Sequence, residues 1–289
     1  MPGKKGKTIK AIIAGKLSKW FESIEDESVR KMAVKNTIVT GGCIASMLLG
    51  EDVNDFDIYF RDKATVKAVA EYYVARFLSK NTKRNMMVQD ENERIKIVIP
   101  SAGVSEDSSI ITVPETIEDT HEDTEIASLA NDGEGKFVPV FLSSNAITLS
   151  DKIQIVLRFY GEPDGIHENY DFAHCMNYYS NWDGKLILRP EALESLLSKE
   201  LRYVGSKYPV CSIVRLRKFI ARGWRINAGQ VLKMAMQVSE LDLTKVEVLE
   251  DQLTGVDTSY FLQLITKLKE KDPDKVETAY LIEIIDRIF

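Results

Sequence analysis

The sequence predicts an α+β protein in which a small mixed sheet is followed by an all-α C-terminal region. Three observations lead to this fold class. Short β-branched or aromatic runs alternate with helical patterns as far as residue 188. A glycine pair joins the first of these runs directly to a helical pattern. From residue 228 onward the apolar residues recur only at helical spacing.

The first 35 residues predict two helices behind a basic tail. Apolar residues recur at helical spacing from Ile12 to Ile24, and a second helical pattern begins at Val29. The tail contains Lys4, Lys5, Lys7 and Lys10. We expect it to be a solubilising terminus, with a contact to RNA as the alternative.

Residues 37–60 are the stretch around which the chain is organised. Residues 38–40 are β-branched and predict a strand, and Gly41 and Gly42 follow where an apolar helical pattern begins. A glycine pair lets the backbone approach a ligand closely, and a helix start presents N–H groups and a positive dipole end to an anion. Gly50 is predicted to end this helix. The pattern therefore predicts a phosphate-binding turn.

Asp55 and Asp57 are two residues apart in the next predicted strand. The two-residue period of a strand puts both carboxylates on one face, with Phe56 and Ile58 on the other. Two carboxylates about 4 Å apart near a protein surface repel by roughly 4 kcal/mol, which a divalent cation would relieve. Mg²⁺ typically binds one or two carboxylates together with substrate phosphates. The strand therefore predicts a metal site beside the phosphate-binding turn.

The middle of the chain predicts one helix, five strands and an acidic insertion. The helix is expected at 63–79, and the strands at 86–89, 95–99, 137–142, 146–149 and 153–160. A helical start is the alternative for the last of these. Residues 161–165 predict a turn. We expect the nearby His167 to lie at the surface. Residues 101–135 carry many acidic side chains without any Lys or Arg, which predicts a solvated, mobile insertion.

The C-terminal region predicts a basic helix at 211–226 and further helices at 231–238, 260–268 and 276–288. The expected organisation is therefore N-terminal helices with a basic tail (1–35), a sheet-containing catalytic domain (36–188, with the insertion at 101–135) and a helical neck and C-terminal domain (189–289).

Composition excludes several classes of protein. A net charge of −6 argues against a general nucleic-acid coat protein, although a local basic face could still bind RNA. The three cysteines lack the spacing of a metal site and suit a reducing compartment. No apolar run approaches the length of a membrane span, and no signal-peptide core is present. We therefore expect a cytoplasmic protein, in the host cytoplasm if a phage encodes it.

The glycine pair and the acidic pair together resemble the head motif of the polymerase-β-type nucleotidyltransferase superfamily, nearest its branch of CCA-adding enzymes and bacterial poly(A) polymerases. The chain is also similar to predicted nucleotidyltransferases of large tailed phages. The matching positions are Gly41, Gly42, Ile44, Leu48, Leu49, Gly50, Asp55 and Asp57. The chain departs from this motif at Ala45, Ser46 and Glu51, and Ser46 could offer its hydroxyl to a phosphate.

Two later segments resemble the same branch more loosely. Around residues 169–205 the resemblance assigns the third catalytic carboxylate to Asp171, because Gln154 lies near the position expected to be acidic. A helix cap or hairpin position is the alternative for Asp171. Residues 211–226 resemble the neck helix, which implies that Arg215 and Lys218 contact the nucleotide or RNA; a plain solvated helix face is the alternative.

The resemblance implies transfer of a nucleoside monophosphate from an NTP to a hydroxyl, with an RNA (tRNA-like) 3′ end as the expected acceptor. Asp55 and Asp57 would bind two Mg²⁺ ions, or Mn²⁺ in their place, while Gly41, Gly42 and Ser46 would hold the phosphates. The alternatives are transfer to a protein or small-molecule hydroxyl, and a non-catalytic nucleotide-binding protein that kept the fold. The residues aligned with the branch's base-reading motif are Tyr208, Pro209 and Ser212, so a true CCA-adding enzyme is disfavoured.

Overall fold

The computed structural model describes residues 3–80, 86–91, 94–98 and 136–253. Its contacts divide the described chain into two units. The first unit contains residues 3–80, 86–91, 94–98, 136–167 and 174–196, and the second contains residues 168–173 and 197–253. The predicted acidic insertion and the helices expected at 260–268 and 276–288 lie outside the described residues.

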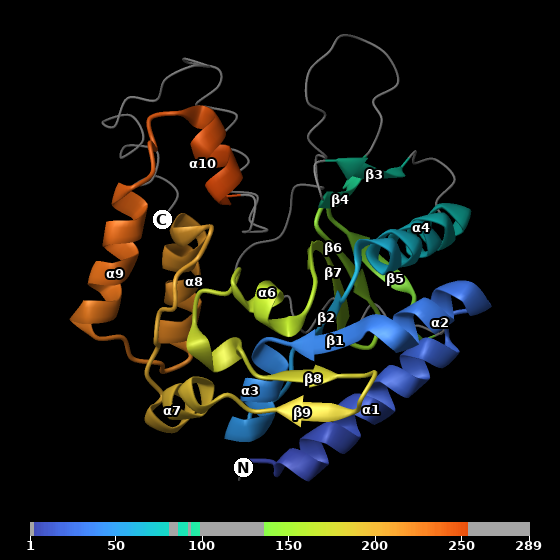
Figure 1. Cartoon of the computed structure of the whole chain (residues 1–289), viewed down its shortest axis with the longest axis horizontal. Helices are drawn as coiled ribbons and strands as arrows, with labels where there is room; N and C mark the ends of the chain where they lie inside the picture. Colours follow the sequence, from blue (N-terminus) through green and yellow to red (C-terminus); the bar gives the residue numbers. More distant parts are fainter. Residues whose placement is uncertain (1–2, 81–85, 92–93, 99–135, 254–289) are drawn as a thin grey trace. The chain divides into compact units, whose positions relative to one another are not determined.

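A seven-stranded mixed sheet forms the centre of the first unit (Figure 1). The strand order is β5-β6-β7-β2-β1-β8-β9, in which β2 and β7 pair parallel and all other neighbours pair antiparallel. The strands are β1 Thr37–Thr40, β2 Phe56–Phe60, β5 Pro139–Leu142, β6 Ala146–Leu149, β7 Ile153–Tyr160, β8 Tyr178–Ser180 and β9 Lys185–Ile187. A separate hairpin consists of β3 Met87–Glu91 and β4 Arg94–Val98. Residues 153–160 are therefore a strand rather than a helix.

One face of this sheet is apolar because hydrophobic residues are in register across its central strands. Phe56 is opposite Ile153, and Ile58 is opposite both Ile155 and Val39. All five side chains belong to one buried cluster, to which the N-terminal helices also contribute. These helices are α1 Gly6–Glu22, α2 Glu27–Asn36, α3 Gly42–Leu49 and α4 Lys63–Lys80. The helices thus cover the apolar face of the sheet. The polar residues of β2 lie on the opposite face.

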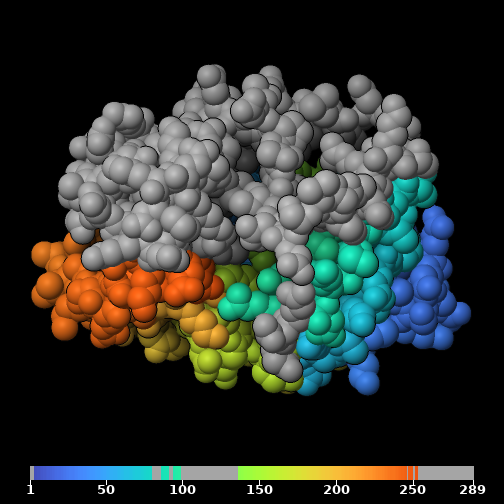
Figure 2. Space-filling model, turned by 90° about the horizontal axis from the view of Figure 1, so that it is seen from above, coloured from blue at the N-terminus to red at the C-terminus, as the bar shows by residue number. Residues whose placement is uncertain are grey.

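The N-terminal helices belong to this core rather than lying apart from it. Trp20 of α1 is fully buried and donates its indole N–H to the Tyr73 hydroxyl of α4 at 2.8 Å. Asp26 caps the start of α2 by accepting from the backbone N–H groups of Ser28 and Val29. Figures 1 and 2 both show α2 beside α4 at one edge of the unit, in agreement with the contacts between the two helices.

The prediction of a turn at residues 161–165 and of a surface position for His167 is wrong. The chain forms a short helix, α6 Pro163–His167, and the His167 side chain is only 2% exposed. Proline and acidic residues favour the first turn of a helix as readily as a β-turn, so local composition did not separate the two structures.

The described part of the second unit is helical, as the fold class predicted. It contains α8 Pro209–Ala221, α9 Ala228–Ser239 and α10 Val246–Leu253, whereas α7 Pro190–Ser198 crosses from the first unit into the second. Phe172 packs its ring edge-on against Phe219 of α8, with the ring centroids 5.4 Å apart. Helix α10 was not predicted. Among the described residues, no helix has the length and apolar character that a membrane crossing requires.

Candidate active site

The turn between β1 and α3 brings the glycine pair against the acidic strand. Thr40, the last residue of β1, is paired with Asp57 of β2. Gly41 follows with φ +95°, in the region that favours glycine. A Cβ atom at Gly41 would lie 2.5 Å from Oδ2 of Asp57, closer than atoms can approach. Glycine is therefore required here by the proximity of the carboxylate as well as by the backbone angle.

Asp55 and Asp57 flank Phe56 at the beginning of β2, and both carboxyl side chains are partly exposed. Phe56 and Ile58, which alternate with them, are buried in the apolar cluster. Asp57 therefore alternates with buried residues, as the two-residue period of a strand predicts. Asp57 thus lies on the face of β2 opposite to Phe56 and Ile58, and Asp55 lies just before the strand.

The charges of the two carboxylates also affect the pKa of the Cys43 thiol. Cys43 is buried in the first turn of α3, and burial is the main cause that raises the pKa of its thiol well above its ordinary value. The negative charges of Asp57 and then of Asp55 raise that pKa further. The negative charges of both carboxylates thus act on the first turn of α3.

These two aspartates fit a magnesium site that a substrate completes. Within the described ranges 3–80, 86–91, 94–98 and 136–253, no group of three or more His, Cys, Asp or Glu side chains could hold a metal ion. Mg²⁺ often binds through only one or two carboxylates, with water and substrate phosphates as the remaining ligands. Asp55 and Asp57 match that donor set.

The start of α3 forms the second side of the candidate site. Gly42 is exposed, and a Cβ atom there would meet nothing within 4 Å. Ser46 lies four residues further along α3, on the same helix face as Gly42, and is partly exposed. Gly41 donates its own N–H to the Cys175 carbonyl at 3.1 Å.

The strand next to Asp57 carries an amide where a carboxylate was expected. In the parallel pairing of β2 and β7, Gln154 is opposite Asp57, and Thr148 of β6 is opposite Gln154. On the other side, Thr40 is opposite both Asp57 and Tyr178. The row of side chains through Asp57 is therefore polar, and Gln154 occupies the position beside it.

A buried network that the sequence did not reveal supports the end of β1. The Thr40 hydroxyl lies 2.9 Å from the Asn177 carbonyl oxygen and 2.8 Å from Nε2 of His167, within hydrogen-bond distance of both. Burial, and secondarily the charge of Arg189, lowers the pKa of His167 to about 4, which keeps the ring neutral. The network fixes the residue that precedes Gly41. His167 is buried by contacts with residues distant in sequence, among them Thr40 and the ring of Tyr178.

The other predicted site residues belong to the second unit. Asp171 is 7% exposed, and its Oδ2 lies 3.0 Å from Nε of Arg215 on α8. The Asp171 carbonyl also accepts the backbone N–H of Val204 at 2.9 Å. Lys218 lies on α8 as well. The structure thus brings Asp171 and Arg215 together in one unit, and Gly41, Gly42, Ser46, Asp55 and Asp57 together in the other.

Solved structures similar to this chain include CCA-adding enzymes. One, a Thermotoga maritima CCA-adding enzyme complexed with tRNA, is 16% identical, with a TM-score of 0.41 over 91% of this chain and 57% of that one. Another, a CCA-adding enzyme with CTP, is 15% identical, with a TM-score of 0.39 over 89% of this chain and 53% of that one. These are members of the branch that the sequence motif resembles. At this level of similarity they carry no argument about activity.

A curated relative and a family model also match. The relative, named Gabija anti-defense 2, comes from Bacillus phage SPbetaL7 and is 18% identical over 257 residues. This alignment covers 88% of the chain but only 50% of the relative, so the chain spans about half the relative's length. The model described as Gabija anti-defense 2 family protein matches residues 11–199, which include the whole glycine and aspartate site. The chain therefore belongs to the Gabija anti-defense 2 family.

Proposed function

We propose that this protein is a metal-dependent nucleotidyltransferase that moves a nucleoside monophosphate from an NTP to a hydroxyl acceptor. One observation supports this proposal most directly: the approach of the Asp57 carboxylate to Gly41 at the start of α3. It joins a carboxylate pair suited to Mg²⁺ and a helix start suited to phosphate in one place.

In the proposed reaction, the acceptor hydroxyl oxygen attacks the α-phosphorus, the bond to the β-phosphate oxygen breaks, and pyrophosphate leaves. Asp55 and Asp57 bind the divalent cations and orient them toward the triphosphate. The bound cations supply charge stabilisation for the attacking and leaving oxygens. The N–H groups in the first turn of α3 and the Ser46 hydroxyl bind the phosphates, and Gly42 allows them to approach the backbone.

We propose an RNA 3′ end as the acceptor, on two grounds. The sequence motif resembles a branch that extends RNA ends, and the chain carries a basic helix although its net charge is −6. The basic residues in and just after α8 are Arg215, Arg217, Lys218, Arg222 and Arg225. We propose that Arg215 and Lys218 contact nucleotide or RNA phosphates. Tyr208 and Pro209 at the start of α8 lack the paired acid and arginine of a base-reading template, so we do not propose CCA addition.

Membership of the Gabija anti-defense 2 family favours a second candidate acceptor. If the protein acts against a defence system, a hydroxyl side chain on a protein of that system is a direct target for nucleotidyl transfer. The chemistry at Asp55 and Asp57 would be the same. Only the labelled product distinguishes the two candidates.

The experiment that tests the proposal incubates the purified protein with each α-labelled NTP, Mg²⁺ and either total RNA or a lysate that contains the Gabija system. We expect label in RNA, or in a protein band for the second candidate, and loss of label in Asp55→Asn and Asp57→Asn. Asp52→Asn removes one charge from an exposed position in the same loop and serves as the matched control. Nucleotide binding without label in any product would contradict transfer and favour the non-catalytic alternative.

A further inference from the structure

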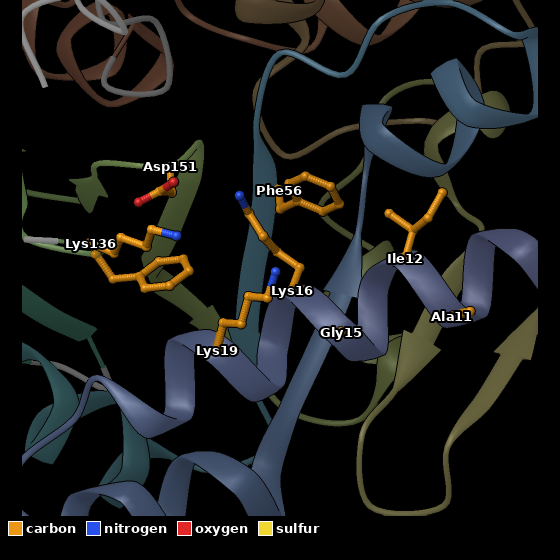
Figure 3. A pocket seen from close by; sticks show the side chains of 9 residues that line it. Ala11, Ile12, Gly15, Lys16, Lys19, Phe56, Lys136 and Asp151 are labelled. Atoms are coloured by element: carbon orange, nitrogen blue, oxygen red, sulfur yellow. The ribbon is translucent and has the colours of Figure 1, made fainter. Parts of the chain in front are cut away.

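A second candidate site lies in the first unit, against the apolar face of β2. A pocket of about 420 Å³ opens between α1 and the loops that precede β5 and β7 (Figure 3). Its volume is within the range of small-molecule sites. It is lined by Ala11, Ile12, Gly15, Lys16, Lys19, Phe56, Lys136, Phe137 and Asp151. Phe56 reaches it from the opposite side of β2 to Asp57, so the pocket is separate from the candidate active site.

Positive charge concentrates in this pocket. Figure 3 shows Lys16 and Lys19 from α1 and Lys136 from the facing loop extending toward the same space. The adjacent Lys152 also contributes, because its charge and those of Lys19 and Lys136 all disfavour protonation of Lys16. Burial is the largest cause that lowers the pKa of Lys16, and Asp151 opposes it. Among the lining residues, one carboxylate thus faces three lysines, and an anion would relieve their mutual repulsion.

The Lys16 side chain is placed by two aromatic rings. Its Nζ lies 5.6 Å from the ring centroid of Phe56 and also 5.6 Å from that of Phe137. Both rings are almost fully buried, at 7% and 2% exposure. A lysine restrained in this way loses less side-chain entropy on binding an anion than a freely solvated lysine does.

The backbone around the pocket adds an independent observation. In the described residues, four side-chain-bearing residues have positive φ, and three of them are Phe137 at 58°, Asp151 at 62° and Lys152 at 59°. This conformation is uncommon for residues that carry a side chain, and such residues cluster at ligand-binding sites. The strain is thus concentrated where the lysines converge.

We propose that this pocket binds the phosphate moiety of a small phosphate-bearing ligand, at a site distinct from Asp55 and Asp57. Lysine is a common point-charge ligand for phosphate, and the pocket provides three without needing a metal ion. Inorganic phosphate, pyrophosphate and the phosphate end of a nucleotide share this chemistry. Phe56 lies between Asp55 and Asp57 in sequence, so a ligand here contacts the same strand segment as the metal site.

The test is calorimetric titration of the full chain with pyrophosphate in buffer containing EDTA, which removes the divalent cations that Asp55 and Asp57 would need. We expect saturable one-to-one binding. The double variant Lys16→Met and Lys136→Gln should weaken it by about tenfold or more. Methionine keeps the apolar stem between Phe56 and Phe137, and Lys19→Gln, at an exposed position, serves as a second variant if the first does not fold.

Two controls make the outcome specific. Lys31→Met with Lys185→Gln removes the same charge from exposed positions elsewhere in the first unit, and it should leave binding unchanged. Asp55→Asn with Asp57→Asn should also retain metal-free pyrophosphate binding, so failure of the proposed function and failure of this site are distinguishable. Titrations with phosphate, ATP and a short RNA distinguish the sources of the phosphate group. Absence of binding by all the small anions, equal loss in the Lys31 control, or binding of RNA alone would overturn the proposal.

Discussion

Gly41 and Asp57 are in such close proximity that any side chain at position 41 would collide with the carboxylate: a Cβ atom there would lie 2.5 Å from Oδ2. At the neighbouring Gly42, an added Cβ atom would meet no other atom within 4 Å. The two glycines of the motif therefore have different physical roles. Gly41 leaves room for the Asp57 carboxylate, and Gly42 leaves open space at the start of α3.

This difference predicts opposite effects of the two alanine substitutions. Gly41→Ala should lower the free energy of unfolding by about 1–3 kcal/mol through its positive φ alone, and it should displace Asp57 and abolish metal-dependent binding. Gly42→Ala should leave the melting temperature unchanged or slightly raised, because alanine is favoured in a helix, while nucleotide affinity falls. Denaturant unfolding and Mg·NTP titration of both variants check this. Equal stability of the two proteins would contradict the assignment of Gly41.

The pairing of Asp57 with Gln154 predicts a gain of metal affinity on substitution. Neighbouring strands are about 4.8 Å apart, so Gln154→Glu would add a carboxylate directly beside Asp57. We expect tighter Mn²⁺ binding and lower stability in EDTA, because the added charge repels Asp57 when no cation is bound. Thr148→Glu, one strand further away, is the control. An unchanged Mn²⁺ affinity in Gln154→Glu would show that this position does not face the metal.

Asp171 remains a prediction as the third carboxylate. If Asp171 takes part in the reaction, Asp171→Asn should keep nucleotide affinity within a few-fold while turnover falls by roughly two orders of magnitude. If it serves only to pair with Arg215, Asp171→Asn and Arg215→Gln should lower the melting temperature to similar extents, and Asp171→Asn should retain full activity. A stable and fully active Asp171→Asn would redirect the search to Asp164 or Glu168.

Two buried histidines predict acid sensitivity. Burial lowers the pKa of both His167 and His174 from 6.5 to about 4, so the unfolded chain binds more protons between these values. Stability should be complete above pH 6.5 and should fall as the pH decreases toward 4, by up to about 3 kcal/mol per histidine. Denaturant midpoints measured across this range check the expectation. The double variant His167→Gln and His174→Gln should flatten the profile, and an unchanged slope would contradict it.

The buried hydrogen bond between Trp20 and Tyr73 predicts that α1 is needed for the stability of the sheet domain. Tyr73→Phe leaves the indole N–H of Trp20 buried without its 2.8 Å partner and should cost about 1–3 kcal/mol. Tyr72→Phe, which removes a hydroxyl that accepts from the exposed Glu25 backbone, should cost less. Thermal unfolding of both variants compares the two. A smaller loss for Tyr73→Phe would show that the hydrogen bond between Trp20 and Tyr73 contributes little to stability.

The sequence alone determined the local parts of this protein. Ile38 and Val39 predicted a strand through β-branching, Gly41 and Gly42 predicted the start of a helix, and the period of two predicted a shared face for Asp55 and Asp57. These features depend on residues within one or two turns of one another, which propensity and alternation describe well. The helices α1, α2, α4 and α9 were predicted for the same reason.

Only the tertiary structure decided which distant residues meet. The parallel pairing of β2 with β7 placed Gln154 beside Asp57, and the packing of α6 buried His167 against Thr40. The convergence of Lys16 and Lys136 likewise required α1 and a remote loop to share one pocket. Such contacts follow from the burial of the whole apolar face of the sheet, a collective property to which residues far apart in the chain contribute together. No local pattern in the sequence indicates which distant residues will contact one another.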